Sequence, residues 1–565
     1  MPPFFAALVL VAPGLLLCVA LLALSTSGMR PAGILLSSRI ATLAALLLAV
    51  AATVWVTWQG PVTSPLLGLG GLGLSIRLDP VSCTMFLLVA FVGTIVVQYS
   101  RNYLDGDARQ GAFIGGLCLT ISAVLLLVLA GNLFQLAAAW IATSLSLHQL
   151  LMFYRERPAA VLAARKKFIT ARLGDTGLLG ACVLLASAFG SSDIATILER
   201  ARELDAAAVP ASLQFAALLL ACAALLKSAQ FPTHGWLPEV METPTPVSAL
   251  LHAGIINAGG FLVIRFADVM LLSAPSLHVL AVVGGFTALF GSVVMLTQPS
   301  VKGSLAWSTV SQMGFMLLQC GFGAFSVALL HIVAHSLYKA HAFLSSGSVV
   351  ELARSAVAPR EQGTSRVMVG VASLGFAMAL YVAMNFALAS VVDADATLSP
   401  AVFTLGTILV LGVALFIAQS VPLAAGAGSM AASPNMPAMD AANAQTSHLS
   451  LRVLVRTLAA AAFATAAYFL LQQLAAWWTQ PSLPAIPVAS PVGLAIMGLA
   501  VLSFAIVALL QLMAPARIGN PHWRAARVHL ANGLYVNAWF DRLVGALRRP
   551  LAHVSGNTSG KEQAA

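Results

Sequence analysis

The sequence predicts an all-α, polytopic membrane protein with about fifteen transmembrane helices. Of its 565 residues, 59% are hydrophobic and only 8% are charged, whereas a soluble domain carries about 25% charged residues. Apolar runs of roughly 20 residues, the length that crosses a bilayer, recur over most of the chain. The net charge of +10 does not indicate a nucleic-acid-binding protein, because the Lys and Arg residues lie between the apolar runs or at their ends.

Taken in order, the apolar runs give fifteen candidate spans. They cover residues 3–25, 35–57, 80–99, 111–130, 133–154, 168–190, 211–230, 246–271, 277–297, 301–320, 324–350, 366–391, 400–424, 451–474 and 489–514. No basic segment precedes the first run, so we expect a span rather than a cleaved signal peptide. The six cysteines all lie in apolar runs without a CxxC pair, which argues against disulfides and a structural zinc site.

The basic residues predict the orientation of these spans. They gather in the loops after odd-numbered spans and in the tail, whereas the loops after even-numbered spans are poor in them. The residues concerned are Arg30, Arg39, Arg101, Arg109, Arg155, Arg157, Arg165, Lys166, Lys167, Lys302, Arg354, Arg360, Arg366, Arg517, Arg524, Arg527, Arg542, Arg548 and Arg549. Because cytoplasmic loops are enriched in Lys and Arg, we expect the N-terminus outside and the C-terminus in the cytoplasm.

Composition divides the chain into four parts. Residues 1–424 form a transmembrane core, and residues 425–447, rich in small residues, predict a flexible linker. Residues 448–514 hold the last two spans, and residues 515–565 form a basic, amphipathic tail. The mixed aromatic and basic residues of 522–547 fit either a helix on the membrane surface or a docking segment for a soluble partner.

Leu226–Phe266 is the stretch that departs most from this apolar pattern. It holds a lysine, two histidines, two glutamates and four prolines between long apolar runs. Pro232 and Pro238 predict a broken helix near residues 227–238, and a broken helix at membrane depth typically marks an ion or substrate site. Lys227 is then either a helix-end lysine that reaches the surface or a buried, functional amine.

The eleventh span carries the strongest local pattern. His331, His335 and Lys339 recur every four residues in HIVAHSLYKAH and form one stripe about 12 Å long, with His341 off it. Titratable groups aligned along a membrane helix indicate a proton relay, because histidine titrates near neutral pH. The alternative is a polar seam between helices.

Two further polar features allow two interpretations each. His252, the one histidine of its apolar run, is either a core residue with its hydrogen bonds satisfied or part of a relay. Arg172 and Asp175 lie three residues apart and can pair on one helix face. That pair either helps the helix to insert or places Asp175 so that it tunes a neighbouring lysine. The sequence contains no constellation for nucleophilic catalysis, no phosphate-binding loop and no metal-ligand cluster, so we expect a transporter subunit rather than an enzyme.

The sequence resembles the antiporter-like membrane subunits of respiratory complex I and of the Mrp antiporters. The resemblance covers roughly residues 75–350 and rests on segments 227–260, 305–315, 331–350, 78–104 and 168–177. It implies the antiporter-like fold. It also implies a proton or cation pathway through Lys227, His252, His331, His335, Lys339 and Asp175.

The sequence departs from that family at two places. In the complex I subunits, a glutamate directly after a tryptophan of the fifth span pairs with the broken-helix lysine, but here Ile141 follows Trp140. Spans twelve and thirteen contain no charge beyond Arg366 at their edge, where the family carries a later lysine. The complete complex I proton path therefore cannot be transferred to this chain.

These departures, the length and the tail segment ANGLYVNAWFDRLV resemble a side branch, the membrane subunits of DAB-type inorganic carbon accumulation complexes. That resemblance implies a bacterial inner-membrane protein whose soluble DabA-like partner carries zinc, is similar to β-carbonic anhydrase and binds on the cytoplasmic face. No cofactor is then expected on this chain. The alternatives are a proton-translocating subunit of a complex I-like or Mrp-type assembly, and a membrane scaffold that moves no ions.

Overall fold

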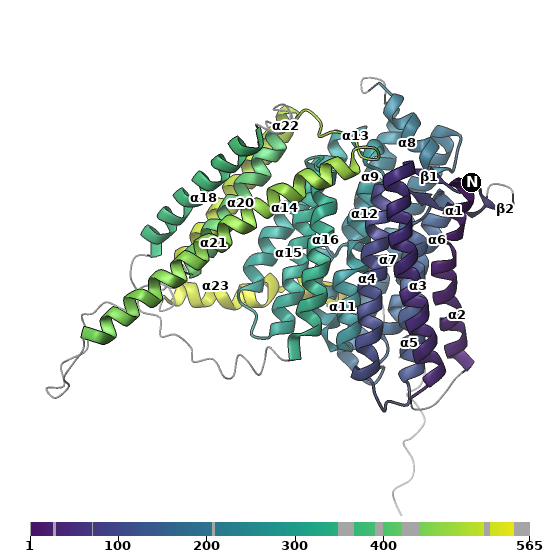
Figure 1. The fold of residues 1–565 in the computed structure, drawn as a ribbon, viewed down its shortest axis with the longest axis horizontal. Coiled ribbons are helices and arrows are strands. Elements are labelled where there is room, and N and C mark those ends of the chain that lie inside the picture. Colours follow the sequence, from purple (N-terminus) through teal and green to yellow (C-terminus); the bar gives the residue numbers. More distant parts are fainter. Residues whose placement is uncertain are drawn as a thin grey trace, which may run out of the picture.

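The computed structural model describes residues 2–25, 30–69, 72–205, 209–347, 366–389, 399–420, 440–513 and 520–546, and nearly all of them are helical (Figure 1). Most of the long helices run roughly side by side through a bundle, and the 40-residue helix Asp440–Thr479 lies obliquely across them (Figure 1). The long helices are α2 (Val11–Ser25), α3 (Ala32–Gln59), α4 (Pro80–Tyr103), α5 (Gln110–Val128), α6 (Leu133–Leu151), α7 (Pro158–Phe189), α9 (Ala211–Lys227), α14 (Ala274–Met295), α15 (Val301–Gly321), α16 (Phe325–Leu344), α18 (Arg366–Ala389), α20 (Pro400–Ser420), α21 (Asp440–Thr479) and α22 (Pro491–Met513).

Short elements connect the long helices. The short helices are α1 (Pro2–Leu8), α8 (Ile194–Glu203), η2 (Thr233–Gly235), α10 (Trp236–Glu239), η3 (Val240–Glu242), α11 (Thr245–Ala253), η4 (Ile255–Asn257), α12 (Ala258–Arg265), α13 (Ala267–Leu271), α23 (Pro521–Ala531), η6 (Gly533–Tyr535) and α24 (Val536–Ala546). Two antiparallel ribbons lie between α3 and α4 in the chain. One pairs β1 (Val62–Thr63) with β4 (Arg77–Leu78), and the other pairs β2 (Leu67–Leu69) with β3 (Leu72–Leu74).

All fifteen predicted spans fall on helices of the structure. Twelve helical segments of the described residues are long and apolar enough to cross a membrane, and they include α11 through α12 taken as one. The apolar helix α9 has 17 residues, and α6 and α15, which carry more polar side chains, have 19 and 21. Within the bundle, α9 packs against α7, α6 against α5, and α15 against α14. With its twelve membrane-length segments, the chain is a multi-pass membrane protein.

Helices α14 and α15 approach each other closely through glycines. A Cβ atom added at Gly284 would lie 2.7 Å from the carbonyl oxygen of Gly314, and one at Gly321 would lie 2.4 Å from the backbone nitrogen of Ala281. Small residues at such positions let helix backbones approach in a membrane. This contact holds α15 firmly in place beside α16, with which it also packs.

The predicted broken helix is present. Helix α9 ends at Lys227, and the chain passes through η2, α10 and η3 before α11 begins at Thr245. A second interruption, which we did not predict, separates α11 from α12 at Gly254, whose φ of −123° and ψ of −67° are not helical. Both breaks lie close to the polar side chains described below, as expected where backbone groups must be satisfied away from lipid.

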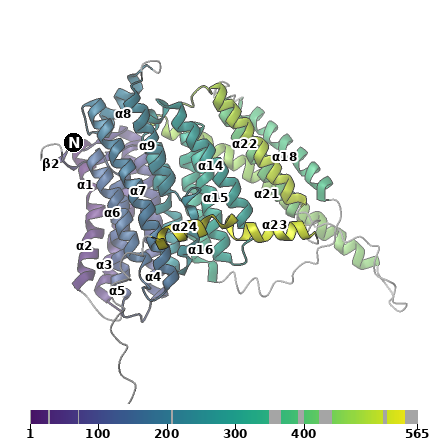
Figure 2. The ribbon, with the colours of Figure 1, turned by 180° about the vertical axis from the view of Figure 1, so that it is seen from behind.

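The C-terminal part differs in detail from the prediction. Residues 425–439 of the predicted linker lie outside the described residues, and residues 440–447 form the start of α21. Of the predicted tail, residues 520–546 form α23, η6 and α24, which run across the bundle at a steep angle to its helices (Figure 2). The tail lies on the end of the bundle that holds the α14–α15 turn, because Gln298 Nε2 donates to the carbonyl of Ala531 at 3.2 Å.

Candidate functional site

A line of basic side chains is buried inside the bundle. Lys227 on α9, His252 on α11, and His335 and Lys339 on α16 are each at most 8% exposed, and His331 is half-buried. Lysine and histidine side chains inside a membrane protein are costly, so they are retained where they serve a function. The structure brings these residues together in two groups, one around Lys227 and one around His252.

Lys227 ends α9 and points toward α6. Its Nζ atom lies 3.3 Å from the carbonyl oxygen of Trp140, to which it donates, and 4.2 Å from the centre of the Trp140 ring. The cation–π contact and the hydrogen bond hold the amine inside the protein. Lys227 is therefore not a helix-end lysine that reaches the surface.

Asp175 supplies a carboxylate to the Lys227 group from α7. Arg172 Nη2 lies 2.7 Å from Asp175 Oδ2, so the two residues form the ion pair that their spacing predicts. Neither Asp175 oxygen accepts an aligned hydrogen bond among the described residues, although the Trp140 side chain is close enough to interact with the carboxylate. Asp175 and Lys227 are close enough for their charges to act on each other.

Lys167 also belongs to this group, which the sequence did not predict. We expected Lys166 and Lys167 in a basic loop before a span at residue 168, and that is wrong, because α7 begins at Pro158. Lys167 is 5% exposed, and its Nζ donates to the carbonyl oxygen of Ser144 at 2.6 Å and to Ser144 Oγ at 3.0 Å. The sequence feature that could have identified Lys167 is its spacing of eight residues from Asp175, which places both residues on one face of a helix.

The second group is a hydrogen-bonded network between α11, α15 and α16. Thr309 Oγ1 donates to the carbonyl of Leu305 at 3.1 Å, so it accepts the hydrogen of His252 Nδ1 at 3.0 Å. Lys339 Nζ donates to the same Leu305 carbonyl at 2.9 Å. Neutral His252 then has an unprotonated Nε2, and this buried atom has no partner among the described residues. The network therefore leaves one acceptor free to take a proton.

His335 joins this network through the second helix break. Its Nε2 lies 3.2 Å from the carbonyl oxygen of His252, and since a carbonyl can only accept, that nitrogen carries the hydrogen. The His331 ring lies 6.1 Å from the His335 ring, between centroids, and both line a cavity of about 1020 Å³ between α14–α16 and α20–α22. His341 is exposed, as its position off the stripe predicts.

Polar contacts at the second break also link the two groups. Ser228, the residue after Lys227, donates through Oγ to the carbonyl of Ile256 at 3.3 Å. Asn257 Nδ2 donates to Ser336 Oγ on α16 at 2.8 Å. Residues 254–257 thus contact the neighbour of Lys227 on one side and the histidine helix on the other. This link could not be predicted from the sequence, because Asn257 lies alone in an apolar run.

Comparison with known proteins agrees with this architecture. The family "NADH:quinone oxidoreductase/Mrp antiporter, TM" matches residues 130–388, and "NADH-Ubiquinone oxidoreductase (complex I), chain 5 N-terminus" matches residues 69–114. The Probable inorganic carbon transporter subunit DabB2 of Halothiobacillus neapolitanus is 38% identical over 484 residues, which are 84% of this chain and 81% of that protein. The chain belongs to the DabB family of inorganic carbon transporter subunits.

Other relatives of this DabB-family chain match it over shorter stretches. The Probable inorganic carbon transporter subunit DabB of Hydrogenovibrio crunogenus is 48% identical over 280 residues, 49% of this chain and 54% of that protein. NAD(P)H-quinone oxidoreductase chain 5 of Synechocystis is 40% identical over 276 residues, 48% of this chain and 40% of that protein. In the structure of the Mrp complex from Dietzia, one chain shares the fold with a TM-score of 0.54 and 24% identity, over 97% of this chain and 58% of that one.

The position of Ile141 in this DabB-family chain explains the unusual setting of Lys227. Ile141 is a half-buried aliphatic residue, and the acceptor of the Lys227 amine is instead the carbonyl of Trp140, one residue earlier. The carboxylate whose charge acts on Lys227 is that of Asp175 on α7. Within the described part of the chain, no three His, Cys, Asp or Glu side chains are arranged to hold a metal ion.

Two further charged clusters lie outside this line. Arg265 Nη1 lies 2.5 Å from Asp79 Oδ2, and Arg77 Nε lies 2.8 Å from the same oxygen, so they tie the start of α4 to the end of α12. Lys166, fully buried, binds Glu239 at 2.7 Å and Asp541 of α24. This second cluster, which we call the tail cluster, fixes the tail to the short helices that follow Lys227.

Proposed function

We propose that this chain is the ion-conducting, energy-coupling subunit of an inorganic carbon accumulation complex. Protons, or sodium ions, move down their gradient along Lys227, His252, His331, His335 and Lys339, with Asp175 beside Lys227. That movement drives the conversion of CO2 to bicarbonate on a soluble, DabA-like partner that resembles carbonic anhydrase and holds zinc. The chain itself is then not an enzyme and carries no cofactor.

The observation that carries this proposal is the hydrogen-bonded network of Lys339, Thr309, His252 and His335. It places titratable groups from two helices around a helix break, with the buried His252 Nε2 free to accept a proton. A membrane anchor has no need of such groups, because polar side chains in the bilayer raise the cost of insertion. The network therefore favours an ion pathway over a scaffold.

The tail supports a partner on its own face of the membrane. In α23, no residue is buried, and its Arg524 and Arg527 side chains are exposed. The tail cluster holds α24 against the segment after Lys227. A partner bound to the tail would therefore lie close to the short helix α10, which follows Lys227 in the chain. The basic residues of the predicted loops and of the tail support, by the positive-inside rule, a cytoplasmic tail in a bacterial cell and an N-terminus outside.

The competing function is a proton-translocating subunit of a complex I-like or Mrp-type assembly. The family match fits this alternative, and the Mrp complex chain shares the fold. Two features argue against this alternative, because they leave fewer titratable groups to carry protons along the membrane. Residue 141 is an isoleucine, and the described residues of α18 beyond Arg366 and of α20 carry no charge.

The experiment that tests the proposal measures uptake of labelled inorganic carbon in cells that carry the chain, its partner or both. We expect accumulation only with both, and we expect deletion of the chain to make cells depend on elevated CO2. An uncoupler should abolish accumulation, because a gradient supplies about 2.3 kcal/mol per charge per 100 mV. Uptake that persisted without a gradient would refute the proposal. Loss of NADH oxidation on deletion, with carbon uptake intact, would support the competing function.

A further inference from the structure

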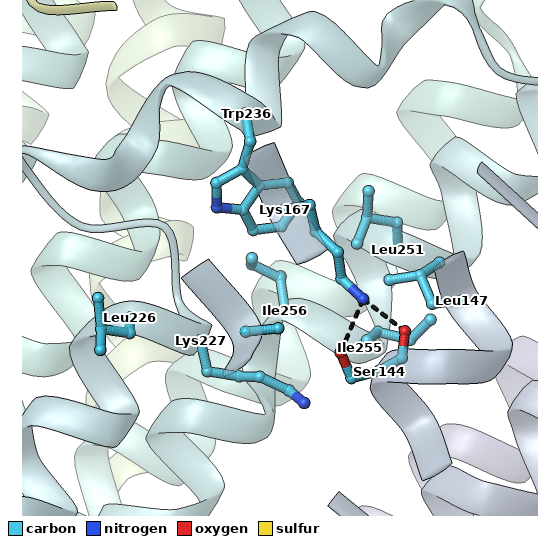
Figure 3. Close-up of a pocket in the computed structure, with 10 residues that line it drawn as sticks. Ser144, Leu147, Lys167, Leu226, Lys227, Trp236, Leu251, Ile255 and Ile256 are labelled. Atoms are coloured by element: carbon cyan, nitrogen blue, oxygen red, sulfur yellow. Dashed lines mark hydrogen bonds between the residues drawn. The ribbon is translucent and has the colours of Figure 1, made fainter. Parts of the chain in front are cut away.

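Lys167 shares a small cavity with Lys227. The cavity has a volume of about 20 Å³, and the lining residues with polar side-chain atoms are Lys167, Lys227, Ser144 and Trp236, whose indole nitrogen has no hydrogen-bond partner among the described residues. Figure 3 shows both amino groups directed into the space beside Ser144. The rest of the lining is mainly aliphatic, including Leu251 and Ile256.

The size of the cavity limits what it can hold. One water molecule needs about 10–15 Å³ measured in this way, together with two to four polar partners. Two amines and the Ser144 hydroxyl supply those partners. A bicarbonate ion, with four non-hydrogen atoms, is larger than a water molecule and does not fit. The space therefore has room for one water molecule and for nothing larger.

The charges around the cavity do not balance if every group is ionised. Lys167, Lys227 and Arg172 are basic, Asp175 is acidic, and their charges act on one another. Three positive charges against one negative charge would leave an excess of two inside the membrane. An uncompensated buried charge is strongly unfavourable. Lysine relieves that excess by giving up a proton, whereas arginine stays protonated.

We propose that Lys167 is the second proton-carrying group of the Lys227 site and exchanges a proton with Lys227 through one water in their shared cavity. The ammonium of one lysine gives a proton to the water, and the water gives a proton to the neutral amine of the other. The number of protons and the total charge stay the same. Ser144 holds the Lys167 amine at the cavity through its carbonyl and hydroxyl oxygens. This inference rests on the proposed ion-conducting function.

The test uses the purified complex of the chain and its partner in liposomes with a pH-sensitive dye inside. Lys167→Arg keeps the charge and can still donate to Ser144, but it cannot release a proton near neutral pH. Lys167→Gln keeps a polar donor of similar reach without a charge. We expect each variant to lower ion translocation at least tenfold, with membrane abundance and partner binding unchanged. The matched control is Lys302→Gln, which alters a half-buried lysine whose amine donates to Thr245 at 3.1 Å, outside this cavity.

The outcomes separate this inference from the function on which it rests. If the wild-type complex moves ions and Lys167→Arg retains at least half of its rate, Lys167 only anchors α7 to α6 and the inference is wrong. If Lys167→Arg does not accumulate, a retained rate in Lys167→Gln overturns the inference in the same way. If the wild-type complex moves no ions, the proposed function fails, and the inference fails with it.

Discussion

His335 donates a hydrogen bond of 3.2 Å from Nε2 to the backbone carbonyl of His252. The acceptor lies two residues before Gly254, where the helix between α11 and α12 is interrupted. A side chain of α16 thus contacts the backbone of a broken span, while the His252 ring turns the other way toward Thr309. The His335 side chain thus contacts the backbone directly beside the break.

Lys227→Ala should reduce carbon accumulation at least tenfold and leave the protein in the membrane at normal abundance. The substitution removes a charge that costs about 2.5–3.5 kcal/mol at mid-membrane, so insertion should not suffer. The amine contacts the Trp140 carbonyl and ring inside the protein, which gives it no anchoring role at the surface. Abundance by immunoblot and uptake of labelled carbon are measured in the same cells. Full uptake in the variant would show that Lys227 carries no ion.

His335→Gln and Lys339→Met should be non-additive. The two residues lie one turn apart on α16 and are joined through His252, Thr309 and the Leu305 carbonyl. Residues in one hydrogen-bond network show coupling of about 0.5–3 kcal/mol. We therefore expect the double variant to lose less activity than the sum of the single losses, each expressed as a free energy from the translocation rate. As a control, Lys339→Met is combined with Arg202→Gln, whose side chain binds Asp268 outside the network, and these losses should add. Strictly additive losses for His335→Gln and Lys339→Met would disprove the network.

The sequence predicted the positions of the helices and part of the site for clear physical reasons. An apolar run of membrane length has few alternatives to a helix, because backbone groups must be satisfied away from water. Lys227, His252 and the α16 stripe stand out for the same reason, as polar residues in apolar runs. These residues are the ones that the structure finds buried and hydrogen-bonded, apart from the half-buried His331.

Other parts of the site could not be predicted because their meaning depends on contacts between helices. Lys167 follows several basic residues, which made it look like part of a cytoplasmic loop, and only the packing of α7 on α6 shows its contact with Ser144. Thr309 is an ordinary residue in a membrane helix until His252 is placed beside it. The break at Gly254 has no proline to mark it, and glycine is common in membrane helices.

Asp541→Asn should loosen the tail without affecting membrane insertion. Asp541 and Glu239 both bind the buried Lys166, and Asn537 lies against the same group. Glu239 and Asp541 are 28% and 40% exposed at their side chains, so solvent weakens the contacts, and we expect a cost of about 1 kcal/mol. Limited proteolysis should cut the tail several-fold faster in the variant. The matched control is Arg542→Gln, which alters the adjacent, exposed residue; equal cleavage of both variants would contradict a role for the tail cluster.

His234 should make the folded protein sensitive to mild acid. It lies in η2, between the spanning helices, and its ring packs between Phe231, Phe290 and Trp307, with centroids 5.2 to 5.7 Å apart. Burial lowers the pKa of His234 to about 4 from its usual 6.5. The folded protein therefore keeps this histidine neutral, while the unfolded chain takes up a proton as soon as the pH falls below about 6.5. Its stabilising contribution is complete above pH 6.5 and is lost progressively as the pH falls toward 4.

The measurement is the thermal unfolding midpoint of the protein in detergent at pH 7, 6 and 5. His234→Phe fills the same aromatic site without a titrating group, so it should flatten the part of the pH dependence that His234 causes. For wild type relative to the variant, we expect a loss on the order of 1–3 kcal/mol between pH 7 and 5. The other titratable groups are present in both proteins, so their contributions cancel in the comparison. If wild type and His234→Phe lose stability in parallel as the pH falls, His234 is protonated as easily in the folded protein as in the unfolded chain, and this prediction is wrong.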